Sequence, residues 1–291
     1  MTAIVPTGTT LGATVEGLDL SEPLTPEDTD AVRRALGEHG VLRFPKQVLD
    51  AALLTRFGSQ FGELVETVLG SGGFTEPGVP EVDVLSNIIE DGKPIGLADA
   101  GQDWHTDLSY NNRVALANIL YAVEVPVRDG EPLGRTEFQN MHAAYEDLPA
   151  EIKEEFGDAT VTFDFNKFWD MMRSERGSSR PPLTPEQRAR TPQVSHPMFI
   201  RHPITGRYVL YANPGYAVRV DGLREEESKE LLDYLFAHQL QEKYRYRFHW
   251  TVGDVLMWDD IGTLHRAIGD YLPTERRLMK RCRVLTDGTV G

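Results

Sequence analysis

From residue 82 onward, short runs of β-forming residues alternate with residues typical of turns. This sequence pattern is the strongest constraint on the fold of the chain. Seven runs are expected to form strands, at Val82–Leu85, Asn118–Val125, Ala159–Phe163, Tyr208–Tyr211, Arg247–Thr251, Val255–Trp258 and Leu278–Leu285. Such runs, without a helix between each pair, favour an antiparallel sandwich or barrel over βαβ units. With 291 residues the chain can bury a sizeable core. We therefore expect a mainly β fold with flanking helices.

Four helices are expected around and within the β-rich region. They lie at Thr25–His39, Asp50–Phe61, roughly Met141–Phe156 and roughly Leu223–Gln241. The first has clear boundary signals, because Thr25 is a good N-cap, Pro26 suits the first helical position and Gly40 follows the end. A short strand, Val41–Phe44, is expected directly after it.

The stretch Arg173–Thr191 is rich in Ser, Pro and Arg, and it is too polar and too interrupted to belong to a core. We expect an exposed, mobile loop there. Two interpretations remain open. The loop is either a plain surface excursion or a lid over an active site, since long loops in compact domains often serve as lids.

Composition limits the partners that the chain can bind. The formal net charge of −15 argues against non-specific binding to nucleic acid or to an anionic membrane, although a local arginine cluster could still bind a small anion. The single cysteine, Cys282, lies in an alternating apolar run and is expected to be a core thiol. One cysteine allows no disulfide within the chain, and neither a secretory signal nor an apolar run of ~18 residues is found, so a cytoplasmic location is expected.

The chain carries a His-x-Asp pair, His105 and Asp107, and a lone histidine, His265, 158 residues beyond Asp107 (265 minus 107). A strand ending at this pair would aim both side chains into one cavity, because residues two apart share a face. His265 follows the strand expected at Val255–Trp258, so only the fold can bring the three together. Two imidazoles and one carboxylate on one face of a divalent metal form the facial triad of non-haem Fe(II) oxygenases.

Alternatives to this iron site remain open. A zinc hydrolase could use the same three residues to activate water. A His-x-Asp pair alone is a weak signal, and a non-catalytic barrel with a degenerate site is a further alternative. The other histidines are plausible caps, surface or core residues, namely His39, His142, His196, His202, His238 and His249.

A basic strand is expected to begin twelve residues after His265. Strand alternation puts Arg277, Met279, Arg281 and Arg283 on one face. The opposite face carries Arg276, Leu278, Lys280 and Cys282. A buried guanidinium needs a paired anion, and a ligand carboxylate provides one with bidentate geometry. The alternative is a basic strand on the surface that offsets acidic helices.

Several segments together resemble the TauD/TfdA family of Fe(II)- and 2-oxoglutarate-dependent dioxygenases. They are residues 11–20, Trp104–Asp107, Gly134–Thr136, the stretch from His196-Pro197 to Asn213–Tyr216, Trp258-Asp259 and His265–Ala267. The resemblance covers nearly the whole chain. It implies a single domain over residues 1–291, a double-stranded β-helix (jelly-roll) core, and a lid loop around residues 164–192.

The resemblance also implies roles for individual residues. His105, Asp107 and His265 would bind the iron. Thr136 would hydrogen-bond a carboxylate of 2-oxoglutarate, and Arg277 would form the salt bridge to its distal carboxylate.

Three further residues would face the substrate. Arg281 would face a substrate anion, because the family repeats Arg-x-x-x-Arg here, and Tyr216 and Phe163 would supply aromatic contacts. A rigid count from His265 would select Arg276 and Lys280 instead of Arg277 and Arg281, because the preceding loop is one residue longer than usual. We favour the local motif, since turns absorb single insertions more easily than strands do.

Two departures from the taurine enzymes argue against taurine as the substrate. Those enzymes place a His and a Tyr shortly after the second helix, where Val65–Ser71 offers neither. They also have an Asn four residues before the first iron ligand, where this chain has Gly101.

The resemblance implies oxidative decarboxylation of 2-oxoglutarate to succinate and CO2, with O2 as oxidant, coupled to hydroxylation of a small, anionic organic substrate. Desaturation, cyclisation or cleavage of a carbon–heteroatom bond are alternative outcomes of the same cofactor chemistry. Asp107 argues against a halogenase, because related halogenases lack this carboxylate. We expect no nucleic-acid or membrane partner, and a homodimer or homotetramer.

Overall fold

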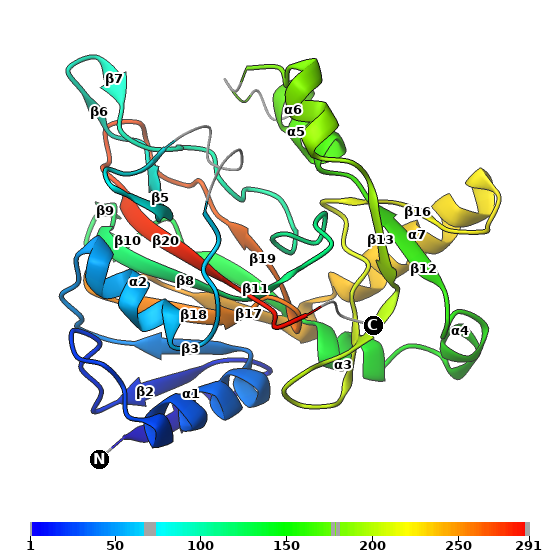
Figure 1. Cartoon of the computed structure of the whole chain (residues 1–291), viewed down its shortest axis with the longest axis horizontal. Helices are drawn as coiled ribbons and strands as arrows, with labels where there is room; N and C mark the ends of the chain where they lie inside the picture. The colour runs from blue at the N-terminus through cyan, green and yellow to red at the C-terminus, as the bar shows by residue number, and fades with distance from the viewer. Residues whose placement is uncertain (1, 67–73, 176–177, 179–180, 289–291) are drawn as a thin grey trace.

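An eight-stranded sheet, in the order β1-β2-β3-β18-β8-β20-β5-β4, is the framework of the computed structural model, which describes residues 2–66, 74–175, 178 and 181–288 (Figure 1). Its strands are β1 (Ala3–Pro6), β2 (Ala13–Glu16), β3 (Val41–Phe44), β4 (Thr75–Glu76), β5 (Val79–Ser86), β8 (Ala115–Glu124), β18 (Val255–Asp259) and β20 (Leu278–Leu285). All neighbours pair antiparallel except β2 and β3, which are parallel. The expected mainly β fold is confirmed.

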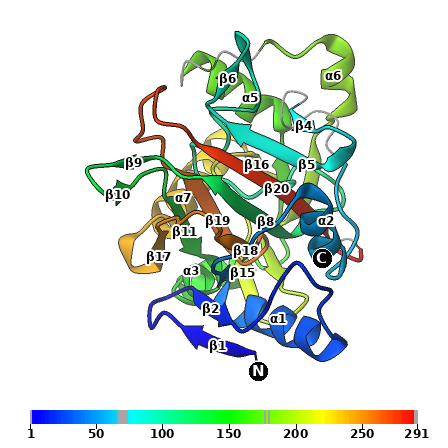
Figure 2. The same ribbon diagram turned by 90° about the vertical axis from the view of Figure 1, so that its left-hand side faces the viewer.

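Smaller sheets complete the β structure. One consists of β17 (Arg245–Phe248), β11 (Thr136–Asn140) and β19 (Thr263–Ala267), and another of β13 (Val194–Pro197), β12 (Thr160–Phe163) and β16 (Ala217–Val220). Three hairpins are formed by β6 (Ile89–Glu90) with β7 (Lys93–Pro94), β9 (Val127–Arg128) with β10 (Glu131–Pro132), and β14 (Phe199–Arg201) with β15 (Tyr208–Leu210). The side view shows β5 and β20 side by side in the main sheet, with the β9–β10 hairpin projecting from it (Figure 2).

The helices flank these sheets. They are α1 (Pro26–His39), α2 (Ala51–Ser59), α3 (Met141–Glu146), α4 (Ala150–Glu155), α5 (Phe165–Ser174), α6 (Pro185–Arg190), α7 (Glu225–Gln239) and the short 3-10 helix η1 (Glu242–Tyr244). The boundaries expected for α1 and α7 are confirmed to within two residues. The expected Met141–Phe156 helix is instead two short helices, because Pro149 starts a new one.

The main sheet is buried on both faces. Val255 and Met257 of β18 pack into the cluster that includes Leu36 of α1 and Phe57 of α2. Leu256 and Trp258 of the same strand belong to the opposite cluster, with Phe138 of β11 and Phe248 of β17. This explains why β18 reads as an unbroken apolar run rather than an alternating one. Cys282 is fully buried in the helix-side cluster, as expected of a core thiol.

The expectation of a loop over Arg173–Thr191 is wrong for part of the stretch. Helix α6 begins at a capping box, in which Oγ1 of Thr184 accepts from the Gln187 backbone N–H (3.2 Å) and Oε1 of Gln187 accepts from the Thr184 backbone N–H (2.8 Å). Just before the stretch, α5 buries Phe165, Phe168 and Trp169. Residues 176–177 and 179–180 of the expected loop lie outside the described residues.

Glu137 organises the outer face of the three-stranded sheet. Its side chain is buried and accepts hydrogen bonds from Arg266 (2.7 Å) and Arg135 (3.1 Å), with Arg247 at 3.4 Å. Burial raises the pKa of the Glu137 carboxyl, but the hydrogen bonds from Arg266 and Arg135 outweigh it and leave the pKa below its usual value. Glu137 therefore stabilises the fold in its ionised form.

We expect Glu137→Gln to lower the free energy of unfolding by about 1–2 kcal/mol at pH 7, because its charge-assisted hydrogen bonds are lost while the arginines can turn to solvent. The stabilisation is fully present above the usual glutamate pKa of ~4.3 and is lost as the pH falls through the lowered pKa of the folded state. Thermal unfolding at pH 7 and below pH ~4 should therefore show the gap to wild type narrowing with acid. The exposed Glu22→Gln is the control, and an equal loss there would contradict the prediction.

Candidate active site

A pair of backbone hydrogen bonds joins the two distant histidines. The N–H of His105 donates to the carbonyl of His265 (3.1 Å), and the N–H of His265 donates to the carbonyl of His105 (3.0 Å). His265 lies within β19, whereas His105 forms only this isolated bridge, and the chain turns at Leu108 with φ of 57°. The strand expected to end at Asp107 is thus reduced to one bridge. The two imidazole rings lie close together, with centroids 4.2 Å apart and planes inclined at 44°.

The three predicted metal ligands meet in one buried cluster. His105, Asp107 and His265 each offer a ligand atom within 4.8 Å of the others. Nε2 of His105 lies 3.6 Å from Oδ1 of Asp107, while Nδ1 of His105 is hydrogen-bonded to the Asp103 carbonyl (2.7 Å) and therefore carries the proton. Nε2 of His105 is thus free to bind a metal. Two imidazole nitrogens and one carboxylate oxygen are the donor set that suits non-haem Fe(II).

The electrostatics of the cluster favour the forms that bind metals. Burial raises the pKa of Asp107, but Arg281 and His105 outweigh it and hold this pKa well below its usual value. Burial, together with neighbouring His105, holds the pKa of His265 well below its usual value. A carboxylate and neutral imidazoles are the protonation states that metal binding requires.

Two glycines allow the backbone to approach His105 closely. A Cβ on Gly215 would lie 2.7 Å from Cβ of His105, and one on Gly101 would lie 3.2 Å from its Cε1. Gly101 also has φ of +68°, a conformation that side chains rarely adopt, and its carbonyl accepts from the N–H of Ala267 (2.7 Å). Gly101, where the taurine enzymes have an Asn, therefore packs closely against a predicted metal ligand.

Arg277 and Thr136 line the same small cavity as the two histidines. The Arg277 side chain is buried, packs near the Tyr271 ring (5.9 Å) and forms no ion pair with any residue that the structure describes. Burial lowers the pKa of its guanidinium, against a smaller opposite effect of Tyr271. Oγ1 of Thr136 accepts a hydrogen bond from Trp250 (3.0 Å), which leaves the hydroxyl hydrogen available to a ligand.

Arg281 also lines the cavity, but its guanidinium is partly engaged. It donates to Oδ2 of Asp107 (2.9 Å) and through two nitrogens to Oδ2 of Asp83 (3.0 and 2.8 Å). A guanidinium has five N–H donors, so these three bonds leave capacity for a further anion. Arg281 therefore orients a predicted metal ligand, a contact that the sequence did not indicate.

Side chains alternate between two faces along β20 and the two residues directly before it, Arg276 and Arg277. Arg277 and Arg281 are buried at the cavity, whereas Arg276 is exposed and pairs with Glu124 (2.8 Å) and Lys280 pairs with Glu76 (3.1 Å). The local Arg-x-x-x-Arg motif therefore gives the correct face.

Of the two predicted substrate aromatics, only Tyr216 lies beside the metal cluster. Its ring is 6.2 Å from that of His105, and it packs against Phe168 of α5 (4.9 Å), which itself contacts His105 (5.6 Å). Phe163 packs instead with His196 and does not line the cavity. Sequence reasoning missed Phe168, although its place on the apolar face of α5 marked it as buried.

The cavity itself is small, about 30 Å³, close to the share of one water molecule in the liquid. Its remaining lining residues are Leu85, Ala100, Gly101, Leu120, Trp258 and Ala267. Pockets that bind organic ligands usually have volumes of ~300 Å³ or more, so a co-substrate needs the lining to open.

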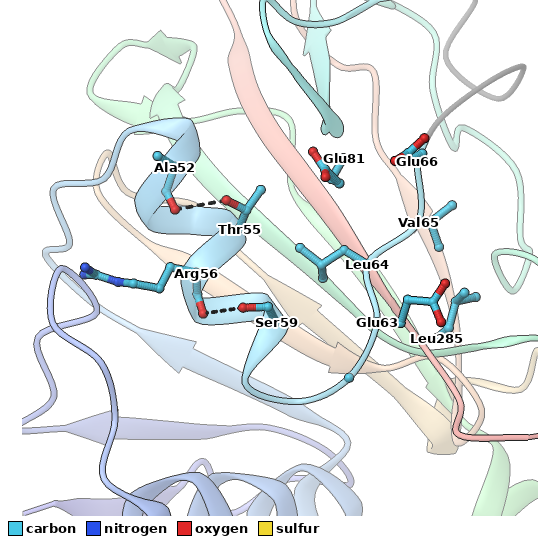
Figure 3. Close-up of a pocket in the computed structure, with 11 residues that line it drawn as sticks. Ala52, Thr55, Arg56, Ser59, Glu63, Leu64, Val65, Glu66, Glu81 and Leu285 are labelled. Carbon is cyan, nitrogen blue, oxygen red and sulfur yellow. Dashed lines mark hydrogen bonds between the residues drawn. The ribbon is translucent and has the colours of Figure 1, made fainter.

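A larger hollow, of about 810 Å³, lies between α2 and the segment after it, away from the histidines (Figure 3). Glu63, Glu66 and Glu81 lie on one side of it. Arg56 points away from them and donates to the Ser21 carbonyl. Among the residues that the structure describes, no cluster of possible metal ligands lies in this hollow.

A second buried group of possible ligands comprises His142, His202 and Asp259. Nδ1 of His202 accepts from the backbone N–H groups of Ile204 and Thr205 (both 3.2 Å), so Nε2 carries the proton and donates to Asp259 (3.0 Å). A protonated nitrogen is no metal ligand. His202 and Asp259 therefore form a structural pair that ties the β14–β15 hairpin to the turn before β19.

A buried cluster of two histidines and one carboxylate, beside a buried arginine that has no ion pair with any described residue, defines the site of a metal-dependent oxygenase. The family described as "Taurine catabolism dioxygenase TauD, TfdA family" matches residues 3–283. The chain belongs to this family. It is an α-ketoglutarate-dependent dioxygenase, which uses Fe(II), 2-oxoglutarate and O2.

Individual relatives agree with this assignment. Pentalenolactone F synthase of Streptomyces avermitilis is 33% identical, over 96% of this chain and 92% of the relative. The alpha-ketoglutarate-dependent 2,4-dichlorophenoxyacetate dioxygenase of a Burkholderia species is 31% identical, over 93% of this chain and 90% of the relative. The crystal structure of AAD-2 with Mn(II) and N-oxalylglycine superposes with a TM-score of 0.79 at 26% identity, covering 99% of each chain.

Within the described part of the chain, no helix has the length and apolar character needed to cross a membrane.

Gly215→Ala should weaken metal binding about tenfold, because the new Cβ must displace His105 by a few tenths of an ångström or more. Gly215 does not have a positive φ, so the substitution tests contact rather than backbone strain. Isothermal titration with Mn(II) measures the effect. Gly288→Ala is the matched control, since its Cβ would meet nothing within 4 Å. Unchanged affinity in the Gly215 variant would contradict the prediction.

Proposed function

We propose that His105, Asp107 and His265 bind the Fe(II), and that Arg277 and Thr136 anchor 2-oxoglutarate. The observation that carries this proposal is the buried Arg277 guanidinium, which has no ion pair with any described residue and lines the cavity beside both histidines. An unpaired buried cation is costly, and the distal carboxylate of 2-oxoglutarate would compensate it. The bound iron would supply the oxidation chemistry, coupled to release of succinate and CO2.

The neighbouring residues prepare this anchor. Gly134 lets the backbone lie against Arg277, because a Cβ there would be 3.1 Å from the guanidinium Nε. Trp250 donates to Thr136, so the hydroxyl of Thr136 is oriented to donate to a carboxylate oxygen. Both contacts hold the anchor in place before the ligand arrives, which lowers the entropic cost of binding.

We propose hydroxylation of a small, anionic organic substrate other than taurine. The remaining N–H donors of Arg281 support an anion near Asp107. Tyr216 and Phe168 offer an aromatic wall beside His105. We do not extend the substrate site to Phe163, because it packs in the core. Desaturation, cyclisation and cleavage of a carbon–heteroatom bond remain alternatives for the same site.

We further propose that residues 164–192 act as a lid, within a single domain over residues 1–291. Two observations support the lid: Phe168 of α5 packs on His105, and the cavity is too small for a co-substrate unless its lining opens. We also infer that the main sheet and the three-stranded sheet, with the site between them, form the two halves of a double-stranded β-helix. A cytoplasmic location and a homodimer or homotetramer stay predictions.

We expect Arg277→Met to raise the concentration of 2-oxoglutarate needed for half-saturation by at least ~30-fold, since losing one partner of a buried ion pair costs ~2 kcal/mol or more. Anaerobic titration of the Fe(II)-loaded protein with 2-oxoglutarate, followed by its visible charge-transfer band, measures this directly. The wild-type band should require both metal and 2-oxoglutarate.

Arg276→Met is the matched control, because it removes a guanidinium from the adjacent, exposed position of the same strand. A band that survives in the Arg277 variant and fails in the Arg276 variant would overturn the proposed anchor.

Succinate release should identify the substrate class. We expect a panel of small carboxylates, sulfonates and sulfate esters to raise succinate formation above the uncoupled rate, and their neutral methyl esters or amides to have less effect. Taurine should behave like a non-substrate. Asp107→Ala should lose at least ~100-fold in coupled turnover, because a metal ligand is removed. Equal stimulation by neutral and anionic compounds would argue against the anionic assignment.

A further inference from the structure

Two successive carboxylates, Asp259 at the end of β18 and Asp260 in the turn that follows it, lie fully buried in the segment that leads to His265. They face different partners. Asp259 accepts from His202 of the β14–β15 hairpin and from the N–H of Ile261 (both 3.0 Å), so it faces away from His265. Asp260 instead faces the predicted metal ligand His265, with 3.9 Å between its Oδ1 and Nδ1 of the imidazole.

Both facing groups have unused hydrogen-bonding capacity. Nδ1 of His265 is buried and has no hydrogen-bond partner among the described residues, and the same holds for Oδ2 of Asp260. Buried polar atoms of this kind are rare in folded proteins and call for an explanation. Because Nδ1 faces Asp260, Nε2 is the nitrogen of His265 left to bind a metal.

Strand β8 fixes Asp260 at two points. The backbone N–H of Asp260 donates to the carbonyl of Leu116 (3.0 Å), and Oδ1 accepts from Nδ2 of Asn118 (2.9 Å). The Asp260 carboxylate is therefore held in place by a buried strand of the main sheet. An acceptor fixed in this way can set the orientation of a neighbouring ring.

We propose that Asp260 is a positioning residue for the metal site, whose carboxylate accepts the Nδ1–H of His265 when Nε2 binds the iron. The distance must shorten by about 1 Å to reach a normal N–H···O hydrogen bond. Metal-bound histidines almost always donate their second N–H to a carboxylate, carbonyl or water, which fixes the tautomer and raises the basicity of the ligand. This inference rests on the proposed metal site.

The test measures the affinity for Co(II), as a probe of the metal site, by competition with a chromophoric chelator. Asp260→Leu should weaken Co(II) binding about 10–100-fold, the usual effect of losing such a partner. Asp260→Asn should stay within about threefold of wild type, because its amide oxygen can accept from both Asn118 and His265. The thermal unfolding temperature of each metal-free variant shows whether it is folded. Should the Leu variant not fold, Asp260→Ala is judged by the same criterion.

Asp259→Asn is the matched control, since it changes a carboxylate of the same turn that faces His202. Its Co(II) affinity should stay near that of wild type. Three outcomes would overturn the inference: unchanged affinity in the Leu variant, equal losses in the Asp259 and Asp260 variants, or an Asn variant as weak as the Leu variant. Failure of wild type to bind Co(II), or unchanged binding in His105→Ala, would instead refute the proposed metal site on which the inference rests.

Discussion

The paired backbone hydrogen bonds between His105 and His265 are the contact on which the site depends. They join segments far apart in the chain, and neither segment can present a metal-binding face alone. The bridge is short because the chain turns at Leu108, directly after Asp107. A third backbone hydrogen bond, from the Ala267 N–H to the Gly101 carbonyl, extends this pairing. The ligand cluster is therefore a consequence of backbone pairing between β19 and an irregular segment.

The main sheet supplies a rigid support behind this contact. β8 lies between β18 and β20, so it contacts both the strand that leads to His265 and the strand that carries Arg277 and Arg281. Apolar clusters cover both of its faces, and close-packed interiors of this kind resist small displacements. The main sheet thus holds both the cluster of predicted metal ligands and the arginines in place. This suits a reaction that requires several reactants at fixed separations.

Local signals explain what could be predicted from the sequence. The ends of α1 were predictable because Thr25 and Gly40 are cap residues whose effect reaches only a few positions. The inward face of β20 was predictable because alternation along a strand is also local. Helix α6 was missed although Thr184 and Gln187 form a capping box, since the surrounding Pro and Ser content suggested a loop.

Contacts between residues that only the tertiary fold brings together could not be predicted from local sequence signals. Asp83 lies 198 residues from Arg281, and Asn118 lies 142 residues from Asp260, so nothing in either neighbourhood marks the contact. The surroundings of Phe163 depend on the tertiary fold in the same way, since this side chain packs against His196 in the core.

Arg277, directly before β20, and Arg281, within this strand, are both buried but differ in their partners. Arg281 is neutralised by the chain's own carboxylates, Asp83 and Asp107, so its charge is compensated without a ligand. Arg277, four residues earlier and on the same face, has the Tyr271 ring nearby but no carboxylate partner among the residues that the structure describes. Removing a charge from water is costly unless an opposite charge compensates it, so only Arg277 gains strongly when a dianionic co-substrate arrives. In the proposed function, the unequal supply of internal carboxylates therefore makes Arg277 the main anchor for 2-oxoglutarate, whereas Arg281 mainly orients Asp107 and keeps only its spare N–H donors for a substrate anion.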